Sequence, residues 1–487
     1  MRVVLANGPW LEEGDTYGLR AGSRWPHVRL KKEQLQYFPF PFYLAGAAGV
    51  AKAAGHDVTL RDCIAAGTSS RQFLEELAAL KPQVVVLETS TPSIKNDLAL
   101  AAAVKRVTGA TVVMAGTHAT ALPAECLAEP SVDYVVRFEY DYALRNLLEA
   151  LEKGQDPSGL GGLALRGADG GVQVNASEPK IPDLDAIPWP LREGLPMARY
   201  NDPFCKQAPN VAMMASRGCP YACTFCVEPT VFYDGSNYRK RSPANIVDEM
   251  EFCIREFGAK EVYFDDSSFS VDQDQVLAIC AEIERRGLKV SWSAMADAHL
   301  KPETLKAMKS AGCVALKFGL ESSDAQILRN IKKHINLDMC KRMVQASNAI
   351  GIETHATNIF GLPGESRETI KATTDFAFKL GTTTAQFALI IPIPGTVLFD
   401  KAKANGWLTT LDWEAYDGCH GAVISYPGLD GDELLKAVRN ARKKLIWKVL
   451  FNPPQLLGYL RMTKALGGWK GLWELATEKT SYLLGGA

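Results

Sequence analysis

The first 150 residues alternate short apolar runs with longer helical stretches. Apolar, largely β-branched runs lie at 3–5, 58–60, 84–87, 111–114 and 133–136. Runs this short predict buried parallel strands, and the stretches at 42–55 and 72–80 predict helices between them. Alternating strands and helices predict an α/β fold with an open, doubly wound, Rossmann-like sheet over residues 1–150.

Small and polar residues follow the predicted carboxyl ends of these strands, where open α/β sheets bind their ligands. These residues are Ser90, Thr91, Gly116, Thr117 and His118. Glycine at such a position lets a large flat ligand approach the backbone closely. For His118, an ordinary loop histidine is the alternative, although its neighbour Gly116 favours a place near a ligand.

Residues 151–205 are rich first in glycine and then in proline, which predicts a linker with one hairpin near residues 169–171. Six apolar runs follow between 206 and 400, near residues 211, 262, 290, 314, 354 and 387. The helical segments between them end on glycine, as left-handed helix C-caps do, at Gly258, Gly287, Gly312, Gly351 and Gly381. Six such units predict a partial (β/α)6 barrel with its chemistry at the carboxyl ends of the strands.

Residues 401–487 read as a helical, aromatic domain. From Asp432 to Lys479 there are ten Lys and Arg against four Asp and Glu, an excess of six positive charges. The favoured interpretation is that this tail plugs the open side of the barrel. Peripheral contact with an anionic membrane surface is the alternative.

The overall composition narrows the function classes. With 54 Lys and Arg against 55 Asp and Glu, the net charge of −1 gives no reason to expect a nucleic-acid partner. The 11 cysteines are mostly scattered singly, which disfavours a disulfide framework and favours a reducing compartment. No signal-peptide pattern or long apolar run is apparent, so we expect a cytoplasmic protein.

The candidate chemistry centres on three cysteines, Cys219, Cys223 and Cys226, spaced C-x3-C-x2-C directly after the first predicted barrel strand. Thiolates at this spacing can converge on one iron–sulfur cluster. Three ligands are one fewer than a closed 4Fe-4S or zinc site needs, which leaves one iron open. The alternative is a structural zinc site with Cys205 as its fourth ligand.

The segment 216–226, with Phe225 before the last cysteine, resembles the signature of radical S-adenosylmethionine (SAM) enzymes. The resemblance implies that SAM chelates the open iron and is cleaved by one-electron reduction to a 5′-deoxyadenosyl radical. Together with the preceding Rossmann-like domain, the chain resembles the cobalamin (B12)-dependent class of these enzymes. The implied cofactors are a 4Fe-4S cluster, SAM and cobalamin.

The B12 fingerprint of that class is Asp-x-His-x-x-Gly, in which the histidine coordinates cobalt. Here the matching segment begins at Asp62 and ends at Gly67, with Ile64 in place of the histidine. An aliphatic side chain cannot ligate cobalt, so we predict that no histidine of this loop reaches the metal.

Polar residues at the other strand ends of the barrel match the same resemblance. A carboxylate after the second strand could accept from the SAM amino group, the fourth strand end suits ribose hydroxyls, and glycines after the fifth admit adenine. The residues are Asp265 and Asp266, then Glu321 and Ser322, then Gly361, Pro363 and Gly364.

The resemblance implies a methyltransferase that abstracts hydrogen from an unactivated carbon of a small-molecule or lipid-like substrate and receives electrons from a flavodoxin- or ferredoxin-type donor. Methylcobalamin would deliver the methyl group. Cyclisation or oxidative rearrangement without methyl transfer is the first alternative. A non-catalytic B12 or redox sensor is the second.

Overall fold

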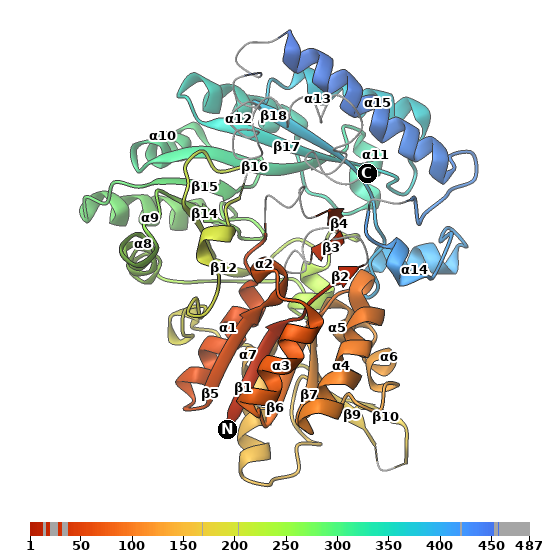
Figure 1. The fold of residues 1–487 in the computed structure, drawn as a ribbon. Coiled ribbons are helices and arrows are strands. Elements are labelled where there is room, and N and C mark those ends of the chain that lie inside the picture. Colours follow the sequence, from red (N-terminus) through yellow and green to blue (C-terminus); the bar gives the residue numbers. More distant parts are fainter. Residues whose placement is uncertain are drawn as a thin grey trace.

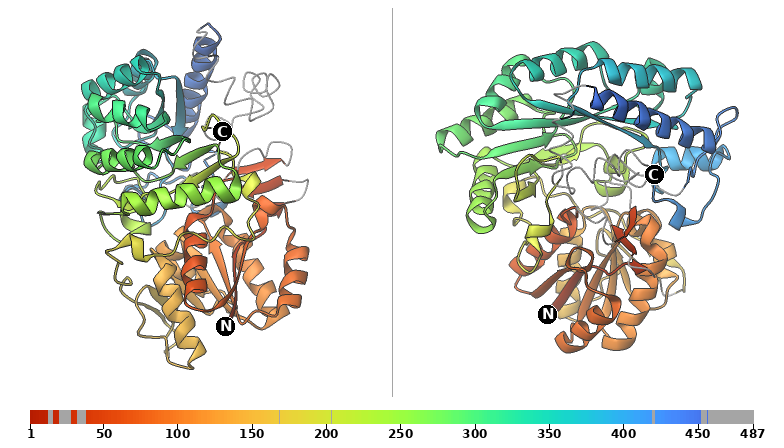
Figure 2. Two further views of the ribbon diagram at one scale, coloured as in Figure 1. Left: turned by 90° about the vertical axis from the view of Figure 1, so that its left-hand side faces the viewer. Right: turned by 45° about the horizontal axis from the view of Figure 1, so that its top comes forward.

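The structure is a computed structural model that describes residues 1–12, 16–19, 28–31, 38–167, 169–202, 204–418, 421–451 and 456. Two β-sheets, each with its own helices, lie one above the other, and their strand ends meet between them (Figure 1). The N-terminal sheet lies below and the barrel arches over it (Figure 2). The functional site is therefore expected where the two sheets face each other.

The N-terminal sheet has the order β10-β9-β8-β7-β6-β1-β5 among the described residues. Five of its strands are parallel, as predicted, and the hairpin β9–β10 of the predicted linker extends the sheet by antiparallel pairing. The strands are β1 (Arg2–Asn7), β5 (Asp57–Asp62), β6 (Val84–Thr89), β7 (Thr111–Gly116), β8 (Tyr134–Val136), β9 (Leu163–Arg166) and β10 (Val172–Val174). The direction of winding changes between β1 and β6, which makes their carboxyl ends the expected ligand site.

Alternate residues of the central strands serve opposite cores. Val84 and Val86 pack toward α1 (Phe42–Ala53) and α7 (Tyr140–Glu152). Val85 and Leu87 pack toward α3 (Ser70–Leu80) and α4 (Ile94–Thr108). The period of two and the helices on both faces confirm the doubly wound fold. Shorter helices α2 (Cys63–Ala66), α5 (Thr117–Ala121) and α6 (Pro123–Leu127) follow individual strands.

The second sheet contains six parallel strands in the order β11-β14-β15-β16-β17-β18, which confirms the predicted partial barrel. The strands are β11 (Asn210–Met213), β14 (Glu261–Phe264), β15 (Ser291–Met295), β16 (Cys313–Glu321), β17 (Glu353–Phe360) and β18 (Thr384–Leu389). The helices are α8 (Pro243–Phe257), α9 (Gln273–Arg285), α10 (Pro302–Ser310), α11 (Ala325–Asn330), α12 (Leu337–Ala349) and α13 (Arg367–Lys379). All five predicted glycines adopt positive φ, between 62° and 98°.

Two small antiparallel sheets complete the strand set. One joins β2 (Leu11–Glu12), β3 (Thr16–Leu19) and β4 (Val28–Lys31). The other joins β12 (Ser216–Cys219) to β13 (Asn237–Lys240) and carries the first cysteine of the motif.

The C-terminal region begins with α14 (Val397–Ala404) and α15 (Gly431–Leu450). Helix α15 lies along β18, and its apolar residues share a core with Phe387 and Leu389 (Figure 1). This packing covers one edge strand of the open barrel and supports the interpretation of a plug. Most of the predicted basic tail lies outside the described residues. Among the described residues, the structure contains no helix with the length and hydropathy of a membrane span.

Candidate active site

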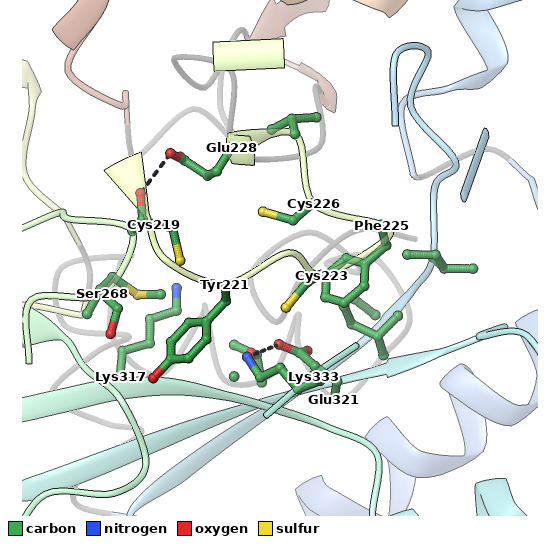
Figure 3. Close-up of a pocket in the computed structure, with 18 of the residues that line it drawn as sticks. Cys219, Tyr221, Cys223, Phe225, Cys226, Glu228, Ser268, Lys317, Glu321 and Lys333 are labelled. Atoms are coloured by element: carbon green, nitrogen blue, oxygen red, sulfur yellow. Dashed lines mark hydrogen bonds and ion pairs between the residues drawn. The ribbon is translucent and has the colours of Figure 1, made fainter. Parts of the chain in front are cut away.

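The three motif cysteines lie at the carboxyl end of the barrel, in the loop that follows β11. All three line one cavity, and Figure 3 shows their side chains around it. The loop is pinned at its centre, because Thr224 N donates to Ile331 O at 2.9 Å and Thr224 O accepts from Leu398 N at 2.8 Å. A short π-helical segment, Glu228–Phe232, follows directly. Such π-helical turns are frequent at functional sites.

The surroundings of Cys205 test the zinc alternative. Within the described ranges, no three His, Cys, Asp or Glu side chains converge closely enough to hold one metal ion. Cys205, the alternative fourth ligand, is buried with its Sγ 3.6 Å from Ser293 Oγ. The same Ser293 Oγ donates to Glu261 at the amino end of β14, so Cys205 lies toward the opposite end of the barrel. The zinc alternative with Cys205 as ligand is therefore wrong.

Burial works against free thiolates at this site. It raises the pKa of the Cys219 thiol to about 11 and also raises the pKa of Cys223 and of Cys226. A cationic iron centre would reverse this effect, since metal coordination favours the thiolate. The three thiols thus fit the cluster that their spacing predicts.

A cavity of about 340 Å3 connects the cysteines to the N-terminal sheet. Thr91, Pro92 and Thr117 form its N-terminal wall, at the carboxyl ends of β6 and β7. The barrel side adds a largely apolar wall that includes Met295, Ile359, Ala388, Leu389, Ile390 and Ile393. One space is therefore lined by both domains.

Glu321 is the most constrained polar residue of the cavity. It follows a register shift at the end of β16 and has a φ of 63°, an uncommon value for a non-glycine residue. Its Oε1 lies 3.3 Å from Lys333 Nζ, whereas its buried Oε2 has no hydrogen-bond partner. Burial raises the pKa of Glu321, although Lys333 acts in the opposite direction.

Two further cavity residues carry buried polar atoms without a partner, Ser268 Oγ and Asn358 Oδ1. Buried polar groups are normally hydrogen-bonded, and an exception invites an explanation by ligand. Ser268 follows β14, Glu321 ends β16 and Asn358 belongs to β17. Together they offer a polar ligand such as SAM hydrogen-bonding sites on one side of the cysteines.

The two aspartates after β14 differ in their contacts. Asp265 and Asp266 both line the cavity, as does Phe225. The Asp266 carboxylate accepts from Ala215 N at 3.1 Å and from Ser216 Oγ. Asp266 therefore also ties the base of the cysteine loop to β14.

Four of the predicted SAM contacts do not line the cavity: Ser322, Gly361, Pro363 and Gly364. Ser322 Oγ instead lies 3.2 Å from Thr373 Oγ1. A Cβ on Gly361 would lie 2.8 Å from Ile390 Cγ2 and 3.3 Å from Leu434 Cδ1 of α15, so close packing accounts for this glycine. Their contact with SAM stays a prediction.

At the edge of the N-terminal sheet where its strands have their carboxyl ends, the predicted residues contact one another and other residues of the same domain. His118 is buried, with Nδ1 3.4 Å from Thr91 Oγ1 and Nε2 3.2 Å from Glu125 Oε2. The hydrogen bond to His118 lowers the pKa of Glu125. Ser90 Oγ lies 2.8 Å from Ser93 Oγ, behind Thr91. Thr91 and Thr117 line the cavity, whereas Ser90 and His118 do not.

Packing and backbone conformation explain why Gly116 and Ile64 occupy their positions. Gly116 has a φ of 102°, and a Cβ there would lie 2.3 Å from Thr89 O, so only glycine allows β6 and β7 to meet in this way. Ile64 is buried in the core beside β1, and Asp62 caps its short helix by accepting from Ala65 N at 3.1 Å. The structure thus places no histidine at the fingerprint position.

Sequence reasoning missed Lys317, Lys333 and the pair Tyr221–Asp297, all of which line the cavity. Lys317 lies in a buried strand, and a charged residue in such a run was a usable signal. Burial lowers the pKa of Lys317. Tyr221 donates to Asp297 Oδ2 at 2.7 Å, a contact between distant segments that no local pattern reveals.

Comparison with known proteins agrees with this site. The family model for the radical SAM superfamily matches residues 213–377, and that for the B12 binding domain matches residues 35–148. "Uncharacterized methyltransferase PH0819" from Pyrococcus horikoshii is 31% identical over 405 residues, which cover 81% of this chain and 87% of that protein. The chain belongs to the B12-binding radical SAM enzymes. The family predicted from the cysteine motif is confirmed.

Two other comparisons show similar chains. "Anaerobic magnesium-protoporphyrin IX monomethyl ester cyclase" from Rubrivivax gelatinosus is 28% identical over 460 residues, covering 91% of this chain and 80% of the relative. The solved structure of the radical SAM methyltransferase TsrM from Kitasatospora setae, with cobalamin and a 4Fe-4S cluster bound, matches with a TM-score of 0.68 at 19% identity. It covers 98% of this chain and 90% of that one, and shows a shared fold. Because the radical SAM and B12-binding family models both match, a 4Fe-4S cluster, SAM and cobalamin are the cofactors of this enzyme.

Proposed function

We propose that this protein is a cobalamin-dependent radical SAM methyltransferase that methylates a carbon atom of a small molecule. The observation that carries the proposal is the shared cavity, which joins Cys219, Cys223 and Cys226 to Thr91 and Thr117 of the N-terminal sheet. A group held by the cysteines and one held by the N-terminal sheet would face the same substrate. The methyltransferase relative described above supports the same reaction class.

The residues of this chain have distinct tasks in that reaction. When bound, the cluster with SAM supplies hydrogen-atom abstraction and cobalamin supplies methyl transfer. Cys219, Cys223 and Cys226 hold the cluster, while Glu321 and Asn358 accept hydrogen bonds from SAM. The apolar barrel wall excludes water, which protects a reactive radical from side reactions.

The walls also indicate the character of the substrate. Leu389, Ile390 and Ile393 present apolar surface to the cavity. Lys317 and Lys333 also line it, together with carboxylates such as Glu321. Binding pockets commonly combine apolar walls with a few polar groups that fix orientation. We infer a mostly apolar small molecule with a polar substituent.

A second candidate is cyclisation without methyl transfer. The cyclase from Rubrivivax gelatinosus aligns over 91% of this chain, almost its whole length. Both reactions use the same cavity and the same first step. They differ in the product, because methylation adds one methylene to the mass of the substrate and cyclisation does not.

The test is anaerobic reconstitution with iron and sulfide, followed by hydroxocobalamin, SAM and a strong reductant. The proposal predicts 5′-deoxyadenosine and the conversion of added cobalamin to methylcobalamin. Magnesium-protoporphyrin IX monomethyl ester serves as a probe for the cyclase reaction. A fully loaded protein that produces neither 5′-deoxyadenosine nor methylcobalamin would instead support the B12 or redox sensor.

Three further expectations remain predictions. These are a flavodoxin- or ferredoxin-type electron donor, location in the cytoplasm, and peripheral membrane contact through the basic tail. Of the ten Lys and Arg on which the last of these depends, six lie in α15 and four lie after residue 451, beyond the continuous part of the chain that the structure describes.

A further inference from the structure

The hairpin that carries Cys219 has an unusual pair of charges. Strands β12 and β13 are antiparallel, and their register places Arg217 directly opposite Arg239. Like charges at directly opposed positions destabilise a strand pair. Both side chains are also largely buried, at 17% and 11% exposure, so water does little to screen the repulsion between their charges. The hairpin therefore needs acidic partners from elsewhere.

Those partners come from the N-terminal domain. Glu139 Oε1 lies 2.5 Å from Arg217 Nη1, and Glu139 Oε2 accepts from Arg239 Nη2. Asp141 Oδ2 lies 2.6 Å from Arg217 Nη1. Glu139 precedes α7 and Asp141 belongs to its first turn, where the helix dipole favours negative charge. Two arginines of the barrel side thus meet two carboxylates of the N-terminal domain.

The cluster is buried and closely packed. Glu139 and Asp141 are only 10% and 6% exposed. Although burial acts to raise it, the two arginines hold the pKa of Glu139 below its ordinary value, so the carboxylate stays ionised. Gly46 of α1 lies beside the cluster, since a Cβ there would be in ordinary van der Waals contact with Arg217 Nη2 at 3.5 Å. Arg239 Nη1 also donates to Ile181 O in the segment that joins the domains, at 2.7 Å.

The position of the charge cluster in the chain links it to the cysteines of the cavity. Arg217 is two residues before Cys219, on the same short strand, and α7 packs against the sheet whose edge carries Thr91 and Thr117. A shift of the hairpin relative to α7 would move the cysteines relative to the N-terminal wall of the cavity. Buried ion pairs add little net stability but fix geometry well, because a lost partner leaves an unpaired buried charge.

We propose that Glu139 and Asp141 are positioning residues, which dock the cysteine hairpin onto the N-terminal domain and thereby set the cobalamin-binding edge against the SAM site. This inference rests on the proposed function. We call the SAM site of the barrel and the cobalamin-binding edge of the N-terminal sheet the two half-sites. Each half-site forms within its own domain, and the proposed role of the four-residue cluster is to align them.

The experiment measures two substrate-free reactions of the reconstituted full chain in one sample. Cleavage of SAM to 5′-deoxyadenosine requires the barrel half-site alone. Conversion of cob(I)alamin to methylcobalamin breaks the S–CH3 bond of SAM, forms a Co–CH3 bond with the electron pair of Co(I), and releases S-adenosylhomocysteine. The second reaction requires that both half-sites face each other, so the ratio of the two rates reports their alignment.

The isosteric variants Glu139→Gln and Asp141→Asn, alone and combined, test the inference. We expect methylcobalamin formation to fall on the order of tenfold to a hundredfold, because small misplacements of reacting groups have effects of that size. SAM cleavage, iron content and hydroxocobalamin binding should stay within about twofold of the parent chain. Hydrogen exchange of residues 216–219 and 237–240 in the protein without cofactors should become faster.

Glu282 provides a matched control. It is 14% exposed and bridges two arginines in the same manner, Arg285 and Arg286, both at 2.7 Å, but it lies on α9 of the barrel and these partners belong neither to the hairpin nor to the N-terminal domain. Glu282→Gln removes a similarly paired charge and should leave the ratio of the two rates unchanged. If Glu139→Gln is insoluble, Glu139→Asp is the substitute. It keeps the charge but moves the carboxylate away from the arginines, so it should lower the ratio of methylcobalamin formation to SAM cleavage by a smaller factor.

The outcomes separate the two proposals. Failure of the parent chain to form methylcobalamin would overturn the proposed function itself. An active parent chain with an unchanged ratio in the Glu139 and Asp141 variants would overturn the docking role. An equal loss of both reactions in Glu139→Gln and Glu282→Gln would do the same, since it would show general destabilisation.

Discussion

The two strand edges that face the cavity differ in how their polar groups are satisfied. On the barrel edge, Ser268, Glu321 and Asn358 each hold a buried polar atom without a partner. On the N-terminal edge, Thr91 and Ser90 contact His118 and Ser93 of their own domain. The barrel edge is built for a ligand that makes specific hydrogen bonds. At the edge of the N-terminal sheet, the polar side chains already have hydrogen-bond partners within their own domain. Such a surface suits a large ligand that is bound by shape complementarity.

The largest effect should come from the cysteines at the centre of the barrel edge. Replacing Cys219, Cys223 or Cys226 by alanine should abolish 5′-deoxyadenosine formation and lower the iron content, because in the proposed site each thiolate is one of three cluster ligands. Iron analysis and product chromatography check this. Cys205→Ala should keep both properties, and its failure to do so would revive Cys205 as a ligand.

Glu321→Gln should have the next largest effect. It keeps the size of the side chain but removes the charge that Lys333 and a bound ligand would share, 3.3 Å from Lys333 Nζ. Charge-assisted hydrogen bonds contribute about 1.5 to 3 kcal/mol, so the KM for SAM should rise roughly tenfold to a hundredfold. Iron content should not change. Glu353→Gln, at the amino end of β17, is the control, and equal KM values in both variants would contradict the role of Glu321.

Thr91→Val tests the N-terminal edge, where a smaller effect is expected. The change keeps the shape of the side chain and removes the hydroxyl next to His118. A neutral hydrogen bond contributes about 1 kcal/mol, so hydroxocobalamin affinity should fall by less than about tenfold. Titration followed by absorbance measures it. A loss as large as that of Glu321→Gln for SAM would mean that the two edges bind their ligands alike.

Glu365→Gln should change stability without changing the chemistry, since Glu365 lies under Gly361 and does not line the cavity. Burial raises the pKa of Glu365 to about 8. Its carboxyl is then protonated in the fold but ionised in the unfolded chain between about pH 4.3 and 8, so stability falls as pH rises, by at most roughly 1.4 kcal/mol per unit. The variant should lose this dependence in urea unfolding, whereas exposed Glu368→Gln should retain it. A pH profile equal to that of the parent chain would show that Glu365 is ionised in the fold.

The sequence by itself determined the elements and the three cysteines that meet at the cavity. Short apolar runs predict the eleven parallel strands that the described residues form in the two sheets, because local polarity and strand length dominate there. The cysteine spacing is likewise local, and it led to the family. Asp265, Asp266 and Glu321 were found because strand ends collect at one edge.

Tertiary structure decided which strand ends reach the cavity. Gly361, Pro363 and Gly364 follow a strand just as Glu321 does, yet α15 and Ile390 pack over the Gly361 turn. Lys333, Asp297 and the partners of Arg217 come from segments far apart in the chain, and no periodicity links them. Local pattern fixes which groups exist at a strand end, whereas burial and charge pairing depend on what the rest of the chain places opposite them.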